Sequence, residues 1–77
     1  MQVKIIMSRR EGGLRVQVWK CLESYFLVEI YSDGVYHLFR CSAGGAKQGD
    51  NLLGHNTAGM AEAKAMALTL AVRGKEK

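Results

Sequence analysis

The hydrophobic pattern of the chain changes period once, and this change limits the folds open to it. Apolar and polar residues alternate through most of the first 41 positions, whereas the last quarter is alanine-rich with helical spacing. Alternation predicts strands with one buried face, and apolar residues three and four positions apart predict an amphipathic helix. We therefore predict an α+β fold: an antiparallel β-meander of about four strands with one C-terminal helix packed on one face.

The short length of the chain predicts a single structural unit. A chain of 77 residues buries only about 60% of its unfolded surface, which supports one thin core and no deep catalytic cleft. We expect one domain over 1–77, with a sheet over about 2–42, a glycine-rich loop over 43–56, a helix over about 58–73 and a tail over 74–77. Residues 1–7 lack the features of a signal peptide, and no apolar run reaches the roughly 18 residues of a membrane span, so we expect a cytoplasmic protein.

Turn-forming residues divide the predicted sheet into strands. Residues 2–8 and 14–21 alternate apolar and polar side chains, and the charged, glycine-containing segment 9–13 predicts a turn between them. A break over 22–24 carries no glycine, so the sequence defines this boundary least well. An apolar run over 25–31 follows the break.

The dipeptide Asp33-Gly34 is the strongest local turn signal, because it separates two aromatic and β-branched runs and favours a two-residue type I′ turn. The predicted pairs are Ile30 with His37, Val28 with Phe39 and Phe26 with Cys41. This register groups Phe26, Val28, Ile30, Phe39 and Cys41 on one face and leaves Leu27, Glu29, Tyr31, Tyr36, Leu38 and Arg40 on the other. A three-residue loop over 32–34 is the alternative, and it would pair Val28 with Leu38 and Phe26 with Arg40.

The helix is predicted with two apolar stripes. Asn56 or Thr57 is expected to cap its start, and Gly74 is expected just beyond its end. The stripe expected to face the sheet contains Met60, Ala63, Met66, Ala67, Leu70 and Ala71. The second stripe contains Ala61, Ala65, Leu68 and Val72, and it either packs under the loop at 43–56 or contacts another protein chain.

The positive charge of the chain is concentrated in its first quarter. The formal net charge is +4, and residues 1–20 carry this entire excess. The basic residues there are Lys4, Arg9, Arg10, Arg15 and Lys20, against Glu11 alone. Such a cluster attracts phosphates or acidic protein surfaces, although basic residues also protect exposed strand edges from unwanted pairing.

The sequence offers no set of residues that predicts catalysis or cofactor binding. Cys21 and Cys41 are expected as buried thiols. His37 and Cys41 lie too far apart along one strand to share a metal ion, and His55 has no partner at ligand spacing. The glycines of the loop match neither the phosphate-loop nor the dinucleotide pattern. We expect no enzyme activity, no cofactor and no metal site.

The segment from Gly54 to Leu68 resembles the last helix of double-stranded RNA-binding domains, in which a Glu-Ala-Lys followed by spaced alanines packs on a three-stranded sheet. The match covers about a fifth of the chain. Of the basic residues that bind phosphates in that family, only Lys64 has a counterpart here. The resemblance implies a shared packing of sheet and helix.

The overall layout resembles the small single-domain anti-CRISPR proteins of phages and mobile elements. The features that carry this resemblance are the short chain, the meander over 26–41 with its Asp33-Gly34 turn, the glycine-rich loop and the alanine-rich helix over 61–72. The resemblance implies stoichiometric inhibition of a CRISPR effector complex, with target DNA recognition blocked, in the cytoplasm of a host cell. The net charge of +4 does not fit mimicry of an acidic duplex.

These observations predict a non-catalytic binding protein, most simply an inhibitor of an effector complex with one of its subunits as partner and no membrane contact. Direct nucleic-acid binding through residues 4–20 is one alternative, and an antitoxin-like oligomerisation module, such as a homodimer, is another. The residues expected to contact a partner are Arg9, Arg10, Arg15, Lys20, Tyr31, Tyr36, Leu68 and Val72.

Overall fold

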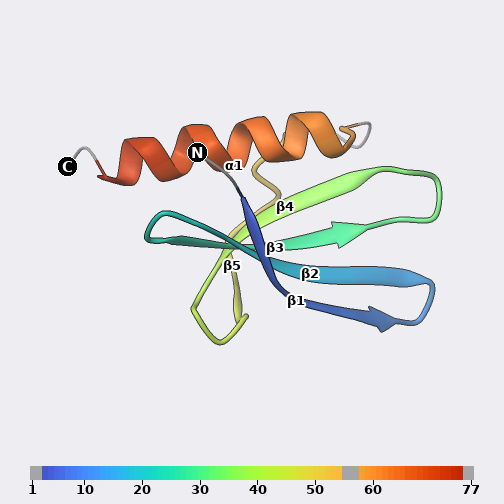
Figure 1. The fold of residues 1–77 in the computed structure, drawn as a ribbon. Coiled ribbons are helices and arrows are strands. Elements are labelled where there is room, and N and C mark those ends of the chain that lie inside the picture. The colour runs from blue at the N-terminus through green and yellow to red at the C-terminus, as the bar shows by residue number, and fades with distance from the viewer. Residues whose placement is uncertain (1–2, 55–57, 76–77) are drawn as a thin grey trace.

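The computed structural model describes residues 3–54 and 58–75, which form one antiparallel sheet with a single helix across it (Figure 1). The elements in chain order are β1 (Lys4–Glu11), β2 (Leu14–Cys21), β3 (Ser24–Ile30), β4 (Tyr36–Cys41), β5 (Lys47–Gln48) and α1 (Met60–Lys75). The strands neighbour one another in chain order, so the sheet is a meander. The predicted fold class is confirmed, and the short β5 inside the glycine-rich segment adds a fifth strand.

The arginines expected in the first turn belong to β1. That strand extends to Glu11, and only Gly12 and Gly13 connect it to β2. Gly12 adopts φ +62°, which glycine tolerates without steric cost. The turn between β2 and β3 is formed by Leu22 and Glu23, and Leu22 adopts φ +56° although it is not glycine. Its side chain packs against the core beneath the helix, which compensates for this backbone conformation.

The expected pairing of β3 with β4 is wrong by one residue. The observed partners are Ile30 with Tyr36, Glu29 with His37, Val28 with Leu38, Leu27 with Phe39 and Phe26 with Arg40, as in the three-residue alternative. Tyr31 and Val35 close the loop, because the Tyr31 N–H donates to the Val35 carbonyl at 2.9 Å. Asp33 Oδ1 accepts the Val35 N–H at 3.1 Å, and Gly34 alone of the three loop residues adopts positive φ. This arrangement avoids the left-handed conformation that a type I′ turn would impose on Asp33.

The main core lies between the sheet and α1. Large side chains come from the sheet, and the buried residues of the helix are Ala63, Ala67 and Ala71, one turn apart. Such small residues let a helix approach a sheet closely. The sheet contributes Trp19, Cys21, Phe26, Val28 and Leu38, all at most 1% exposed. Leu38 therefore lies under the helix, whereas Phe39 and Cys41 lie on the opposite face, which reverses the face predicted for all three.

The face opposite the helix carries a second, smaller core. It is formed by Val16, Val18, Leu27, Phe39 and Cys41, with Met7, Leu14 and Tyr25 packed around it. The turn after β4 covers part of this face, as the segment leading to β5 in Figure 1 shows. At Gly45 (φ +91°) the backbone comes so close that an added Cβ would contact Val18 at 3.5 Å and Met7 at 4.0 Å. The glycine-rich segment thus packs against the sheet face first and reaches the helix side only later, at Leu53.

The ends of the helix differ from the expected ends. It begins at Met60, where the Ala63 N–H donates to the Gly59 carbonyl at 3.1 Å, and it continues through Gly74 to Lys75. Gly74 is therefore part of the helix, and the expectation that it lies just beyond the helix end is wrong. The expected caps, Asn56 and Thr57, lie outside the described residues, as does His55. Met60 is 51% exposed and does not belong to the core stripe, whereas Met66 and Leu70 pack against the core as predicted.

We expect Leu38→Ala to lower the free energy of unfolding by about 2–5 kcal/mol, because it leaves a cavity in a site with no solvent exposure. Met60→Ala, on the exposed side of the helix, should change it by no more than about 0.5 kcal/mol. Urea denaturation measures both values. His37→Ala should lower the free energy of unfolding by less than Leu38→Ala does. The opposite order would contradict the observed register of β3 and β4.

We expect Gly34→Ala to destabilise the protein by about 1–2 kcal/mol, because its φ of +86° is unfavourable for a residue with a Cβ. A methyl group added at Gly34 or at Gly13 would meet no other atom within 4 Å, so the cost is one of backbone conformation alone. Gly13→Ala is the matched control, since Gly13 is not among the residues with positive φ, and it should be neutral or slightly stabilising. Equal thermal melting shifts for the two variants would exclude this explanation.

Candidate functional site

Two arginines lie directly opposite each other near the turn between β1 and β2. Arg10 pairs with Arg15 across the strands, on the side of the sheet that carries the helix, and both side chains are exposed. Like charges in directly opposed positions destabilise a strand pair unless a counter-charge lies nearby. Within residues 3–54 and 58–75, neither guanidinium has an acidic partner. The pair is therefore available to bind an anionic group.

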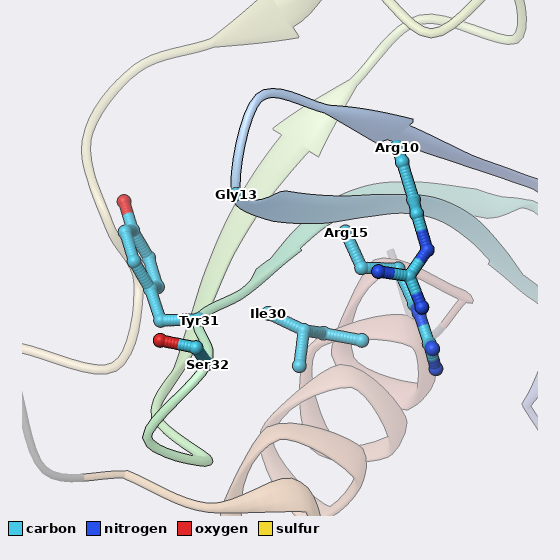
Figure 2. A pocket seen from close by; sticks show the side chains of 6 residues that line it. All are labelled: Arg10, Gly13, Arg15, Ile30, Tyr31 and Ser32. Atoms are coloured by element: carbon cyan, nitrogen blue, oxygen red, sulfur yellow. The ribbon is translucent and has the colours of Figure 1, made fainter.

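The two arginines border a shallow hollow of about 280 Å³ at this end of the sheet. Its lining residues are Arg10, Gly13, Arg15, Ile30, Tyr31 and Ser32. Figure 2 shows the two guanidinium groups close together beside Ile30, with Tyr31 and Ser32 across the hollow from them. The turns that end β1 and β3 bring these residues together, because both turns lie at the same end of the meander (Figure 1). Guanidinium groups can hold a carboxylate or phosphate there through charge-assisted hydrogen bonds.

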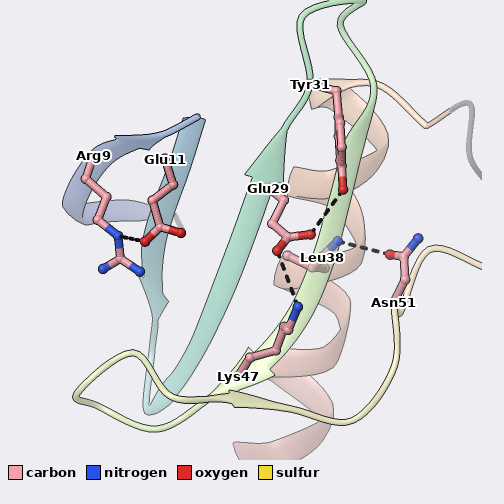
Figure 3. A network of polar contacts seen from close by, with 7 residues as sticks. All are labelled: Arg9, Glu11, Glu29, Tyr31, Leu38, Lys47 and Asn51. Atoms are coloured by element: carbon pink, nitrogen blue, oxygen red, sulfur yellow. Dashed lines mark hydrogen bonds and ion pairs between the residues drawn. The ribbon is translucent and has the colours of Figure 1, made fainter. Parts of the chain in front are cut away.

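Tyr31 also belongs to a polar and aromatic network on the face opposite the helix (Figure 3). Its hydroxyl donates to Glu29 Oε1 at 3.4 Å, and Lys47 Nζ lies 3.3 Å from Glu29 Oε2. The rings of Tyr31 and His37 have centroids 4.8 Å apart, and Lys47 Nζ lies 4.5 Å from the centroid of the Phe39 ring. Burial, and then the charge of Glu29, raise the pKa of the Tyr31 hydroxyl.

Arg9 does not join the other two arginines. It pairs with Val16, whose side chain lies in the core opposite the helix, so Arg9 lies on the other face of the sheet from Arg10. Its Nε forms an ion pair with Glu11 (Figure 3). Of the three arginines expected to contact a partner, only Arg10 and Arg15 therefore lie together.

The remaining predicted contact residues lie apart from this hollow. Lys20 is at the far end of β2, 5.6 Å from the ring centroid of Tyr25. Tyr36 lies on the helix side, half-buried, with its ring 6.3 Å from that of Trp19. Leu68 and Val72 are half-buried on α1, and Leu68 packs against the main core. Tyr31, by contrast, lines the hollow.

The described residues hold no arrangement typical of a metal centre, since no three of their His, Cys, Asp and Glu side chains gather at one place. Cys21 and Cys41 are buried free thiols on opposite faces of the sheet. Burial raises the pKa of the Cys41 thiol, which favours its unreactive protonated form. No described helix is long and apolar enough to cross a membrane.

Sequence reasoning did not single out Gly13, Ile30 or Ser32 as parts of a site. From the sequence, Ile30 is an ordinary core residue and Ser32 an ordinary turn residue. The signal that identifies them is the register, because Arg10, Arg15, Ile30 and Tyr36 form one continuous row across four strands. Comparisons of the chain with protein-family models, curated proteins and solved structures found no match.

We expect Glu29→Gln to lower the pKa of Tyr31, because it removes a negative charge and a carboxylate acceptor that both favour the protonated hydroxyl. The stabilisation linked to this raised pKa is complete below the unfolded value of about 10 and is lost as the pH rises through the folded value. Titration of the tyrosine ring carbons by NMR measures the pKa. Glu23→Gln, in the turn between β2 and β3, is the control that should leave it unchanged. An unchanged Tyr31 pKa in Glu29→Gln would disprove the assigned contact.

Proposed function

We propose that this protein is a non-catalytic inhibitor that binds a CRISPR effector complex and blocks its recognition of target DNA. The observation that carries the proposal is the arginine pair, Arg10 and Arg15, which has no acidic partner in the described chain and lies beside a hollow that Tyr31 also lines. Arginine and tyrosine are enriched among residues that contribute most to protein interfaces. The layout of a short meander with one alanine-rich helix supports an inhibitor of the anti-CRISPR kind by resemblance.

The distribution of charge favours a protein partner over extended nucleic acid. Arg9 is paired with Glu11, and Lys47 is paired with Glu29, so two of the cations on the face opposite the helix are locally neutralised. Affinity for a nucleic-acid backbone rises with the number of phosphates that a protein neutralises. A local pair of arginines is better suited to one acidic site on a folded partner, where complementary charge fixes orientation.

Direct binding of single-stranded nucleic acid is the second candidate function. The observation that favours it is the group of aromatic rings on the face opposite the helix, where the tilted rings of Tyr31 and His37 have centroids 4.8 Å apart and Lys47 Nζ lies 4.5 Å from the centroid of the Phe39 ring. Exposed aromatic rings beside basic residues are typical of surfaces on which unpaired bases stack. This alternative predicts strong binding to a bare strand without any protein partner.

The double variant Arg10→Glu/Arg15→Glu should weaken inhibition of target binding by about a hundredfold, because two charge-assisted contacts are lost and replaced by repulsion. The measurement titrates the protein into purified effector complexes of several types and follows binding of labelled target DNA. Lys64→Glu/Arg73→Glu is the matched control, since it changes the net charge equally at exposed positions of α1 and should inhibit like the unmodified protein.

Three outcomes would contradict this proposal. Equal loss in both double variants would show that overall charge, and not the arginine pair, determines inhibition. Failure to inhibit any effector type would exclude the proposed activity. Submicromolar binding to bare single strands near physiological salt, falling steeply as salt is added, would favour the nucleic-acid alternative.

A further inference from the structure

The fold covers one edge of the sheet and leaves the other open. At β4, residues of the segment that follows the strand occupy the outer edge: β5 pairs with Arg40 and Cys41, and Leu52 N–H donates to the Leu38 carbonyl at 2.7 Å. The Leu38 N–H donates to Asn51 Oδ1 at 3.0 Å (Figure 3). Further along, the Tyr36 N–H donates to the Ala58 carbonyl at 2.7 Å. The outer edge of β4 is therefore closed along most of its length.

The opposite edge, formed by β1, is open. No strand in the described part of the chain pairs with the outer side of this 8-residue strand, as Figure 1 shows. Ile5 and Ile6 are 51% and 42% exposed, and neither packs against either core. An edge strand with free backbone groups and exposed branched side chains is a surface on which another strand can add.

We propose that β1 pairs in antiparallel orientation with β1 of a second copy of this chain, so that two sheets become one continuous sheet across a two-fold axis. The charges at the two ends of the strand select this partner. Lys4 pairs with Lys20 of β2, and Glu11 pairs with Leu14 of β2. Lys20 and Leu14 are six residues apart in one strand, so their side chains lie on the same face of the sheet, and so do those of their partners Lys4 and Glu11. Antiparallel pairing about the middle of β1 brings Lys4 of each copy to Glu11 of the other, so that Glu11 lies between Arg9 of its own strand and Lys4 of the partner strand, whereas parallel pairing would align like charges.

Other features of β1 limit the strength of this contact. A bulge lies between Ile5 and Met7, and bulges interrupt regular pairing at strand edges. Arg9 and Arg10 lie toward the end of the strand, so in the two-fold arrangement they face the half that contains Ile5 and Ile6 and do not face each other. The charges at the two ends of β1 favour pairing, but the bulge near its middle weakens the pairing. We therefore expect a dimer that dissociates on dilution.

Analytical ultracentrifugation over a range of concentrations tests the dimer, and a pair of matched variants tests its location. Ile6→Lys should raise the dissociation constant by about tenfold or more, because it places two further cations beside the basic half of the partner strand. Met60→Lys adds the same charge at an exposed apolar position on α1 and should leave the dissociation constant unchanged. Thermal melting of both variants verifies that the fold is retained.

Charge reversal at the two ends tests the orientation. Lys4→Glu alone and Glu11→Lys alone should each weaken self-association, since each places like charges together at both ends of the paired strands. An equal mixture of the two single variants should form heterodimers at least as tight as the unmodified homodimer, because both ends are then complementary. A monomer at every concentration up to about 1 mM, equal effects of Ile6→Lys and Met60→Lys, or no association in the mixture would each overturn the proposal.

Discussion

The pairing of β3 with β4 determines how the rest of the sheet is buried. The side-chain period of a strand is two residues, so a shift of one residue in β4 would exchange its two faces. The Asp33 side chain accepts the Val35 N–H, and Gly34 takes the one positive φ of the loop. This three-residue turn puts Leu38 beneath the helix and Phe39 on the opposite face. Both cores of this small protein therefore depend on the geometry of one turn.

Both faces of the sheet carry buried residues, although the chain is short. The alanines of α1 allow close packing against the large side chains of β2, β3 and β4 on one side. On the other side no helix is present in the described chain, and the glycine-rich turn after β4 covers part of the second core. The same segment then forms β5 and closes the edge of β4. Residues that the sequence predicts to form a loop thus complete the sheet.

The surfaces for which a function is proposed are those that this packing leaves exposed to solvent. The helix and the glycine-rich segment cover the centre of the sheet and the β4 edge, while the end bearing Arg10, Arg15 and Tyr31 and the edge of β1 stay accessible. Recognition by the arginine pair and self-association through β1 are proposals that can be tested separately, because one depends on side chains beside the turns and the other on the outer edge of the strand. Arg10 is the residue that the two surfaces share, through its position in β1.

The sequence by itself determined the class of the fold, because the change from period two to helical period is a local property of the residues. It likewise determined the concentration of positive charge in the first quarter and the presence of a turn at Asp33-Gly34. The tertiary structure alone decided the length of that turn, since two-residue and three-residue loops are both compatible with the same dipeptide, and the three-residue loop is the one that buries Leu38 under α1. It also decided which arginines meet: Arg9 and Arg10 are adjacent in sequence, yet a strand directs neighbouring side chains to opposite faces, so Arg10 joins Arg15 and Arg9 joins Glu11.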